Sequence, residues 1–495
     1  MRNAPARGWA VLSLIGIATA LTGINLSVMY VVYPEIQQAF PEASSAQTSW
    51  VLNGFTLIMA ATLIIGGVLG DRYGRKRSLI VGLACLGLGS TLCATAPGVG
   101  LIVIGRLVIG LGASLISTSS VAIVLREFPP EHRAAAFGVL GSFGGVAAAA
   151  GPSIGSMVLE LGGWRWAFWI NVPLALVSLV LGVLLLSESR NPDANDFVDA
   201  LSALLMLVSV GLIVLAVVQL PAWGIEDLRT VACVAVAATS AAYLCVRMAG
   251  QAAPLVDLAL VRERNSAIFN AIAFVMGVGW FGMYLAVVLF LRDTWDYTLL
   301  HAGLAITPVF IGAAVLGPLG GRVADRFGFR PNLMAGGLAL AVGALWLIVR
   351  LQNEPDTSVW FIGIVPIAIG TGLVFPSFQA GAIIASSPEQ YGTAAGVNQT
   401  LQRVGAAIGT AITVALVEVA GTEQALDHVL WVIVAAAAVT TAAAAGLAHG
   451  GSTRKVGTVT ARPRRQETLG RIRGDGRRTA TCSRAPTEAR REQKS

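Results

Sequence analysis

Charged residues are concentrated in one short stretch of an otherwise apolar chain. The segment GGVLGDRYGRKR, residues 66–77, places five charges between Asp71 and Arg77, although only 12% of the 495 residues are charged. A carboxylate among arginines can form ion pairs or accept hydrogen bonds. Asp71 is expected at the end of a helix, where the helix dipole already presents partial negative charge, so the acid requires a favourable partner elsewhere. A basic topogenic loop would explain the cations but not this acid.

A second unusual charge lies inside an apolar run. Arg106 interrupts LIVIGRLVIGLGAS, residues 101–114. A charge within a membrane span is costly and marks a functional site by default. A structural arginine bonded to backbone carbonyls is the alternative.

Catalytic and metal-binding patterns do not occur among the cysteines and histidines. The five cysteines include no CxxC pair, and the four histidines include no HExxH pair. A membrane enzyme should bring His, Asp, Glu or Cys together at one membrane face, and these residues are scattered. The sequence therefore predicts no enzyme, no metal site and no cofactor.

Long apolar runs must position these residues. The mean hydropathy is +0.73, and the apolar residues form runs of about 20, the length that crosses a bilayer. The run that begins near Trp9 lacks a cleavage motif and is interpreted as a retained span that ends at Pro34. The predicted spans cover residues 10–33, 50–70, 78–96, 101–124, 134–158, 166–187, 199–220, 230–249, 267–291, 302–321, 332–350, 359–380, 396–417 and 428–448.

Lysine and arginine set the predicted orientation. With the N-terminus inside, 15 of them fall in inner segments before residue 449, and the outer loops hold only Arg165, Arg229, Arg292 and Arg350. Both termini are therefore expected in the cytoplasm of a cell-membrane protein. Residues 449–495 carry a net charge of +9 and lack apolar periodicity, which predicts a disordered basic tail beside anionic lipid. A nucleic-acid-binding arm is the remote alternative, and we predict no nucleic-acid partner.

The charged loop has a second copy. GGVLGDRYGRKR at 66–77 realigns with GGRVADRFGFRP at 320–331, an offset of 254 residues. Six spans in each half leave two spans in excess between them. The predicted division is an N-terminal six-helix half at 1–190, two inserted helices with linkers at 191–264, a C-terminal six-helix half at 265–448, and the tail at 449–495.

These features together resemble a known transporter family. Two halves that each carry G-x-x-x-D-R-x-G after their second span resemble the major facilitator superfamily. With WVLNGFTLIMAATLIIGGVLGDRYGRKR at 50–77, WRWAFWINVP at 164–173 and the inserted pair, the chain is similar to the fourteen-span drug:proton antiporter branch. The resemblance covers residues 9–448 and implies an all-α integral membrane fold of two six-helix bundles plus two inserted helices.

The resemblance assigns a role to the charged loop. It implies that Asp71 contacts the other half and holds the cytoplasmic side closed, while the cations set orientation and could also contact lipid heads. The residues expected in this loop and its copy are Gly67, Gly70, Asp71, Arg72, Gly74, Arg75, Lys76, Arg77, Asp325, Arg326 and Gly328.

Span five resembles the antiporter motif of exporters. Residues 138–156 read GVLGSFGGVAAAAGPSIGS, and small residues recur every four positions, which lets a neighbouring helix approach closely. Proline removes a backbone donor and predicts a bend. Tight packing alone is the plain alternative, and the resemblance favours export. The motif residues are Gly138, Ala147, Gly151, Pro152 and Gly155.

Proton coupling is implied only in part. Arg106 matches the arginine that the family associates with proton transfer, but Asn25 stands where the family has an aspartate. An amide can bond a guanidinium and cannot take up a proton near neutral pH. The 1.5 Å rise per residue places both at a similar depth. The remaining candidates, Glu160 and Glu418, lie at span edges, where solvated helix ends are the alternative.

Substrate contacts are expected on inward faces near the midplane. A cavity that lacks acids disfavours dications and suits neutral, weakly acidic or lipophilic compounds. The candidates, each of which could equally serve helix packing, are Asn53, Trp280, Tyr284, Phe375, Gln379, Asn398, Gln399 and Arg403.

The sequence thus predicts a monomeric exporter of small lipophilic compounds that works by alternating access, with membrane lipid, the substrate and, as the resemblance implies, protons as its partners. An uncoupled or differently coupled metabolite carrier is the second hypothesis. A membrane receptor would carry a large extramembrane domain, and no outer loop exceeds about 20 residues, too few for a folded domain.

Overall fold

The structure is a computed structural model that describes residues 6–190, 199–251, 254–257 and 262–447. The chain divides into two units, Met1–Thr453 and Arg454–Ser495, and everything described lies in the first. The basic tail predicted at 449–495 is therefore outside the described residues.

Within the described ranges all regular elements are helices. They are α1 (Ala6–Ala39), α2 (Ser45–Tyr73), α3 (Arg75–Ala94), α4 (Val99–Glu127), η1 (Pro130–His132), α5 (Arg133–Gly162), α6 (Trp166–Trp169), α7 (Asn171–Leu185), α8 (Ala200–Trp223), α9 (Leu228–Ala249), α11 (Arg264–Asp293), α12 (Leu299–Phe327), α13 (Arg330–Arg350), α14 (Thr357–Ile384), η2 (Pro388–Gln390) and α15 (Tyr391–Ala445).

Many of these helices could cross a membrane. In the described part of the chain, 12 helices are long and apolar enough to do so. One of them includes the 55-residue α15, whose helical backbone is interrupted at Gly421 (φ 79°, ψ 169°), between the predicted spans 396–417 and 428–448. The all-helical membrane fold is thus confirmed, while the count of fourteen spans and the division into domains stay predictions.

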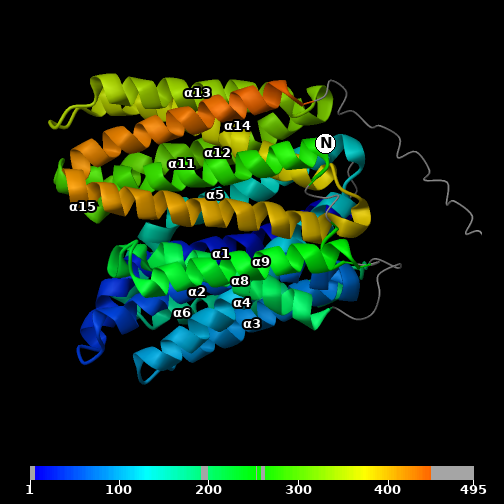
Figure 1. Ribbon diagram of the computed structural model, residues 1–495. Coiled ribbons are helices and arrows are strands. Elements are labelled where there is room, and N and C mark those ends of the chain that lie inside the picture. Colours follow the sequence, from blue (N-terminus) through cyan, green and yellow to red (C-terminus); the bar gives the residue numbers. More distant parts are fainter. Residues whose placement is uncertain (1–5, 191–198, 252–253, 258–261, 448–495) are drawn as a thin grey trace, which may run out of the picture. The chain divides into compact units, whose positions relative to one another are not determined.

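Two separate hydrophobic cores organise the helices. One core joins α1–α7, called the N-terminal bundle, and extends onto α8, α9, the end of α14 and the first turns of α15. The other joins α11–α15, called the C-terminal bundle. In Figure 1 the labels of α1–α4 and α6 lie in the lower part of the view and those of α11–α14 in the upper part, while α5 is labelled at the level of α15.

The two bundles meet along two seams. In the first, α2 packs against α15; in the second, α5 packs against α12. Each seam pairs a helix of one bundle with a helix of the other. Separation of the bundles must therefore open at least one of these seams.

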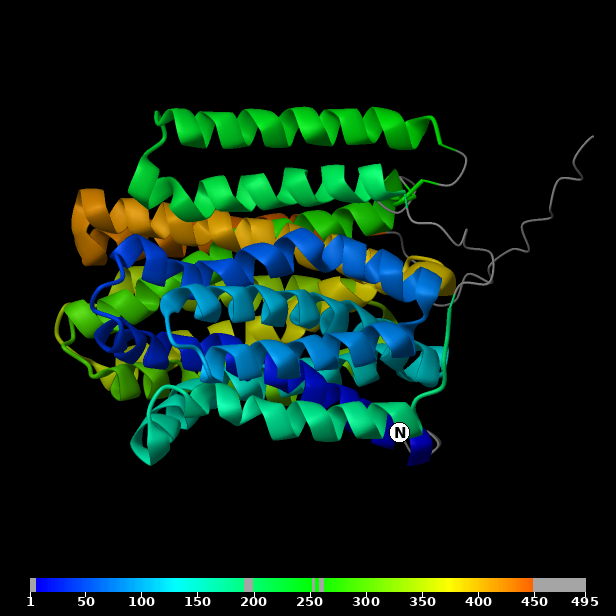
Figure 2. The same ribbon diagram turned by 90° about the horizontal axis from the view of Figure 1, so that it is seen from below.

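The pair α8 and α9 lies outside the bundles. Helix α8 packs against α2 and α15, and α9 packs against α8. Figure 2 shows α9 outermost, then α8, then the orange α15 and the blue α2. Asp199 begins α8 and accepts hydrogen bonds from Arg247 Nε (3.0 Å) and Gln251 Nε2 (2.7 Å) at the end of α9. These bonds hold the pKa of the Asp199 carboxyl well below its usual range.

Proline lies in two of the predicted spans or at their ends. Helix α1 continues to Ala39 with Pro34 inside it, because neighbouring helices in a membrane protein can satisfy the backbone that proline frees. The predicted span 166–187 is matched by one candidate membrane span, Trp166–Leu185, in which α6 and α7 are separated only by Ile170, whose backbone angles are helical (φ −61°, ψ −27°). Pro173 has no N–H to bond the carbonyl of Trp169, so this turn lacks one backbone hydrogen bond.

Candidate functional site

The charged loop is a sharp turn between α2 and α3. Gly74 ends α2 and precedes α3 with φ 121°, a backbone conformation that L side chains rarely adopt. Its N–H donates to the carbonyl of Gly70 (3.1 Å), and a Cβ at Gly74 would lie 2.5 Å from the carboxyl carbon of Glu188. The end of the bundles that holds this turn is called the loop end, and the sequence predicts it to be cytoplasmic.

Asp71 caps a helix of the opposite bundle. Its side chain is buried, and its oxygens accept hydrogen bonds from Gly392 N (3.1 Å), Thr393 N (2.7 Å) and Thr393 Oγ1 (2.9 Å). Gly392 and Thr393 belong to the first turn of α15, where backbone N–H groups have no partner within the helix. The positive end of that helix dipole favours a carboxylate. The acid, which is unfavourable at the end of its own helix, is thus satisfied by a helix from the other half.

Arg75 completes this contact and is not a lipid ligand. It is 3% exposed, and its Nε and Nη2 donate to Asp71 Oδ1 at 3.0 and 2.8 Å. Nη2 also donates to the carbonyl of Pro388 (2.5 Å), in η2 directly before α15. The expected contact with lipid heads is therefore wrong for Arg75, because its guanidinium is enclosed between the bundles.

The other loop cations hold neighbouring segments. Lys76 Nζ donates to the carbonyls of Val183 (2.7 Å) and Leu186 (2.8 Å), at the end of α7. Arg72 Nη2 donates to the carbonyl of Pro254 (3.4 Å) in the segment after α9. Arg77 is the exposed member, and its Nε lies 3.7 Å from Glu188 Oε2. These contacts, together with Gly67 and Gly70 in α2, locate the predicted loop residues around one turn.

The repeated loop makes a second, reciprocal contact. Asp325, near the end of α12, accepts hydrogen bonds from Ala134 N (2.9 Å) and Ala135 N (3.0 Å) in the first turn of α5. Gly328 then ends α12 with φ 81°. The adjacent Arg326 is exposed and lies over the ring of Phe327. Each bundle thus presents a carboxylate, Asp71 or Asp325, to a helix start in the other bundle; we call these two residues the cross-bundle carboxylates.

Glycine lets the two bundles approach closely beside these contacts. A Cβ at Gly67 would lie 2.1 Å from the carbonyl oxygen of Gly392 across the α2/α15 seam. A Cβ at Gly138 would lie 2.2 Å from the carbonyl oxygen of Gly317 across the α5/α12 seam. No side chain larger than hydrogen fits at either position without a shift of backbone.

Three residues of this site were not predicted from the sequence. Thr393 bonds Asp71, and Arg133 Nη1 donates to the hydroxyl of Tyr391 (3.0 Å) across the bundles. The signal that could have found them is another repeat. PEHRAAAFG at 130–138 and PEQYGTAAG at 388–396 are offset by 258 residues, and each forms a short 3₁₀ turn followed by the helix that a cross-bundle carboxylate caps.

Arg106 and Asn25 are in direct contact inside the N-terminal bundle. Both are buried, with Arg106 at 0% exposure and Asn25 at 3%. Arg106 Nη1 donates to Asn25 Oδ1 (2.5 Å), Nε donates to the carbonyl of Val51 (2.7 Å), and the guanidinium lies 4.6 Å from the ring centre of Phe55. These three partners carry no formal negative charge. The exposed Glu160 and Glu418 are not brought to this pair.

The small residues of α5 pack against α1. Cβ positions at Gly151 and Gly155 would lie 2.2 Å from Ser27 Cβ and 3.0 Å from Val31 Cβ. Ala147 lies near Gly23 on the same face. Helix α5 includes residue 152. The bend predicted at Pro152 stays a prediction, because this side chain is outside the described part of the structure. Ala147, Gly151 and Gly155 therefore form a close helix contact within the N-terminal bundle, whereas Gly138 of the same motif lies at the α5/α12 seam.

The substrate candidates fall into separate groups. Trp280 stacks on Tyr284 (5.6 Å between ring centres, 6° between planes) and meets Phe375 edge-on (5.4 Å). Trp280 Nε1 donates to Thr371 Oγ1 (3.1 Å). Asn398 is instead buried and donates to Asn270 Oδ1 (3.0 Å) within the C-terminal bundle. The aromatic residues thus form one cluster that excludes Asn398.

The remaining candidates are polar and come from α2, α14 and α15. Gln399 Oε1 accepts from Ser117 Oγ (2.6 Å), which joins α15 to α4 across the bundles. The other polar candidates are half-buried: Asn53, Gln379 and Arg403.

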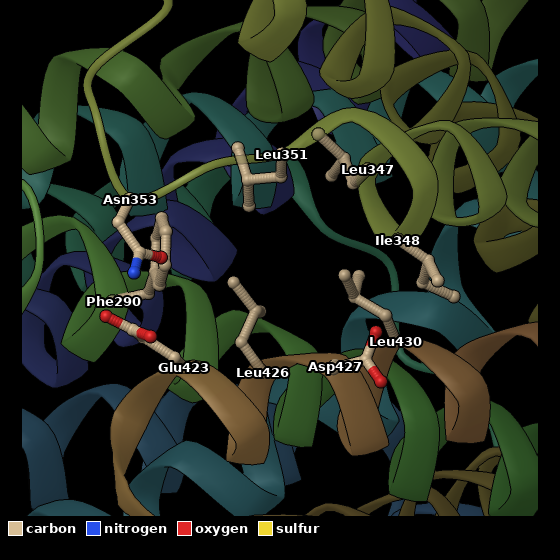
Figure 3. Close-up of a pocket in the computed structure, with 9 residues that line it drawn as sticks. All are labelled: Phe290, Leu347, Ile348, Leu351, Asn353, Glu423, Leu426, Asp427 and Leu430. Carbon is tan, nitrogen blue, oxygen red and sulfur yellow. The ribbon is translucent and has the colours of Figure 1, made fainter.

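A small cavity lies away from all of these residues. It has a volume of about 80 Å³ between α11, α13 and the later part of α15, and Figure 3 shows Glu423 and Asp427 at its edge beside leucines. No predicted site residue lines it. Among the described residues, no group of three or more His, Cys, Asp or Glu could hold a metal ion.

Many apolar helices in two bundles, joined by reciprocal carboxylate contacts at one end, define a polytopic membrane transporter. The sequence model of the Major Facilitator Superfamily matches residues 15–244 and 269–479. The chain belongs to this family, which is a transporter family and not an enzyme class.

Similar proteins include named exporters. The tetracenomycin C resistance and export protein of Streptomyces glaucescens is 29% identical over 415 residues, which cover 82% of this chain and 75% of that protein. A probable actinorhodin transporter of Streptomyces coelicolor is 30% identical over 423 residues, 82% of this chain and 72% of that protein. The multidrug resistance protein Stp of Mycobacterium tuberculosis is 29% identical over 398 residues, 80% and 73%.

A solved structure shares the fold. The human organic anion transporter MFSD10 (TETRAN) superposes with a TM-score of 0.65 and covers 88% of this chain and 99% of its own. The sequence identity is 15%, so this likeness concerns the fold alone.

Proposed function

We propose that the protein is a secondary transporter that exports small lipophilic compounds, such as a drug, an antibiotic or a metabolite, by alternating access. The relative named as a resistance and export protein supports the direction of transport, and the relatives named as a multidrug resistance protein and a probable actinorhodin transporter agree with it. The two inserted helices of the proposed fourteen-span branch correspond to α8 and α9. The proposed location is the cell membrane, with both termini in the cytoplasm and the protein as a monomer in contact with membrane lipid.

The observation that carries this proposal is the pair of cross-bundle carboxylates. Asp71 holds the first turn of α15, and Asp325 holds the first turn of α5, so the two bundles are joined at the loop end. A transporter whose loop end is closed in this way presents its central site to the opposite side. Breaking both contacts would let the bundles separate at the loop end, which is the movement that alternating access requires.

The proposed substrate class follows from the rings in the C-terminal bundle and from the charge inside the N-terminal bundle. The aromatic cluster of Trp280, Tyr284 and Phe375 offers ring faces for stacking. Arg106 bonds the amide oxygen of Asn25 and the carbonyl of Val51, and Asn25 stands where the resemblance expects an aspartate that could pair with a cationic drug. Neutral, weakly acidic or lipophilic compounds therefore suit this interior better than dications.

Coupling to proton influx is part of the proposal, with Arg106 as the family's characteristic arginine. Asn25 favours the alternative, an uncoupled or differently coupled carrier, because an amide in contact with Arg106 Nη1 cannot release or take up a proton near neutral pH. If protons do drive export, an acid at a span edge such as Glu160 or Glu418 must carry them.

Substrate-driven proton movement in inverted vesicles tests both ideas. Wild type and Asn25→Asp are compared with a panel of lipophilic dyes, while a pH indicator reports proton movement. Stoichiometric proton movement by wild type supports the coupled exporter. Dye transport that survives collapse of the proton gradient supports the alternative. If neither protein moves any compound of the panel, the proposal of a multidrug exporter fails.

A further inference from the structure

The two cross-bundle carboxylates are held by unequal sets of donors. Asp71 accepts five hydrogen bonds, from Gly392 N, the Thr393 N–H and hydroxyl, and two nitrogens of Arg75. Asp325 accepts two, both from backbone N–H groups of α5. Asp71 is 4% exposed, whereas Asp325 is only half-buried.

The difference originates at two repeat-equivalent positions. The offset of 254 residues places Phe329 where the first loop has Arg75, and the offset of 258 residues places Ala135 where the second helix start has Thr393. Phe329 packs edge-on against Phe269 (5.6 Å between ring centres) and cannot donate to a carboxylate. The second contact therefore lacks both the guanidinium and the hydroxyl of the first.

Solvent reaches the second contact and not the first. A cavity of about 320 Å³ lies beside Asp325, lined by Glu131, His132, Ala135, Arg322, Asp325 and Arg326. Water there can compete for the carboxylate, which weakens its hydrogen bonds to the backbone. Asp71 is enclosed instead by Arg75 and the first turn of α15.

Additional segments cover the seam that Asp71 joins. Helix α8 packs on both α2 and α15 and so crosses the α2/α15 seam, as Figure 2 shows. The segment after α9 is tied to the same region, because Arg72 Nη2 donates to the carbonyl of Pro254 and the next residues, Leu255 and Val256, are buried in the N-terminal core. Neither α8 nor α9 has a comparable contact with α5 or α12.

We infer that the loop end opens asymmetrically, first and widest between α5 and α12, while the α2/α15 seam acts as the hinge. This inference rests on the proposed alternating-access function. The weak contact at Asp325 releases before the strong contact at Asp71, and α8 keeps α2 and α15 together as the other seam parts.

Two spin-label pairs at repeat-equivalent positions test this directly. The pair Glu131→Cys and Phe327→Cys spans the α5/α12 seam, and the pair Tyr73→Cys and Glu389→Cys spans the α2/α15 seam. All four native side chains are exposed at the loop end. Each pair is labelled in a cysteine-free protein in lipid nanodiscs, and electron paramagnetic resonance measures the distance distribution between pH 5 and pH 8.

The expected result is a longer-distance component at Glu131–Phe327 whose population is at least about threefold larger than at Tyr73–Glu389. Equal populations at the two pairs, a larger one at Tyr73–Glu389, or none at either pair would overturn the inference. Because the readout is a distance and not transport, the inference and the proposed function can fail independently. Asymmetric opening without dye transport would contradict the exporter proposal. Dye transport with symmetric opening would contradict the inference alone.

A variant that equalises the two contacts provides the second test. Ala135→Thr with Phe329→Arg adds the hydroxyl and guanidinium that the second contact lacks. It should reduce the longer-distance component at Glu131–Phe327 at least about threefold. The matched control, Ala135→Val with Phe329→Met, has similar bulk without donors and should leave that component unchanged. An equal reduction by both variants would attribute the effect to packing and contradict the inference.

Discussion

Asp71→Asn is the substitution whose effect the structure determines most fully. The amide keeps the shape of the carboxylate but removes its charge. One of its two oxygens becomes an NH₂ group, which then faces the donors of Thr393 or Arg75. Arg75, 3% exposed, keeps its bond to the carbonyl of Pro388 and loses its anionic partner.

The size of the effect follows from this burial. Removing one partner of a buried ion pair costs about 3–5 kcal/mol, because the remaining charge is left uncompensated. If that amount falls on the closed loop end, the ratio of closed to open protein drops roughly 100- to 4,000-fold, at 1.4 kcal/mol for each tenfold. Asp325→Asn removes a half-buried carboxylate from two backbone donors and should shift the ratio only roughly 5- to 30-fold, for about 1–2 kcal/mol.

Alkylation of a buried cysteine measures this shift. Ala394, 5% exposed in the first turn of α15, is replaced by cysteine in a background free of native cysteines. Its reaction with a membrane-impermeant maleimide is followed in inverted vesicles. Asp71→Asn should accelerate the reaction at least about tenfold and more than Asp325→Asn does. An unchanged rate, with the protein present at normal level and monodisperse, would refute the argument that Asp71 closes the loop end.

Further predictions concern packing, pH and helix capping. Gly67→Ala should reduce dye transport at least about tenfold, because its Cβ would lie 2.1 Å from the carbonyl oxygen of Gly392. In the control Gly100→Ala the new Cβ has no atom within 4 Å, so dye transport should not change. Equal losses of transport in the two variants would contradict the packing argument. Asp199→Asn should lower the melting temperature by the same few degrees at every pH from 5 to 8. The pKa of Asp199 is lowered in the folded protein, so the stabilisation by its carboxylate is present above the ordinary carboxyl pKa of 3.8 and is lost only as the pH falls below that value. A difference that disappears by pH 5 would argue against this assignment. Glu188→Gln should destabilise the start of α3 by about 1 kcal/mol, because the Glu188 carboxylate accepts hydrogen bonds from the N–H groups of Lys76 and Arg77. Calorimetry compares this variant with Glu160→Gln, a substitution of an exposed control residue. Equal unfolding temperatures of the two variants would show that the cap is unimportant.

The sequence predicted the positions where charge would matter but not the partners of those charges. The isolated acid at Asp71 and its copy at Asp325 were recognisable because each follows an apolar run in a repeated segment. Apart from the Thr393 hydroxyl, their partners in the opposite bundle are backbone N–H groups of α15 and α5, and a backbone donor can belong to any residue type except proline. The distance along the chain, 321 residues from Asp71 to Gly392, also lies beyond any local pattern.

Burial was the second property that the sequence could not supply. Arg75 and Arg77 belong to the same basic run, yet Arg75 is enclosed between the bundles and Arg77 is exposed. Only the packing of α15 against α2 distinguishes them. Depth was easier to predict than contact: a constant rise per residue placed Asn25 and Arg106 at similar levels, and the structure has them hydrogen-bonded.

The central claim is that separation of the bundles at the loop end is required for export, and a reversible cross-link tests it most directly. Arg133 and Tyr391, which are in contact across the bundles at 3.0 Å, are replaced by cysteines in a background free of native cysteines. A short methanethiosulfonate cross-linker joins them, and uptake of a lipophilic dye into inverted vesicles is measured before and after reduction. We predict that the cross-link abolishes uptake and that reduction restores it. Uptake that continues in the cross-linked protein would contradict the claim.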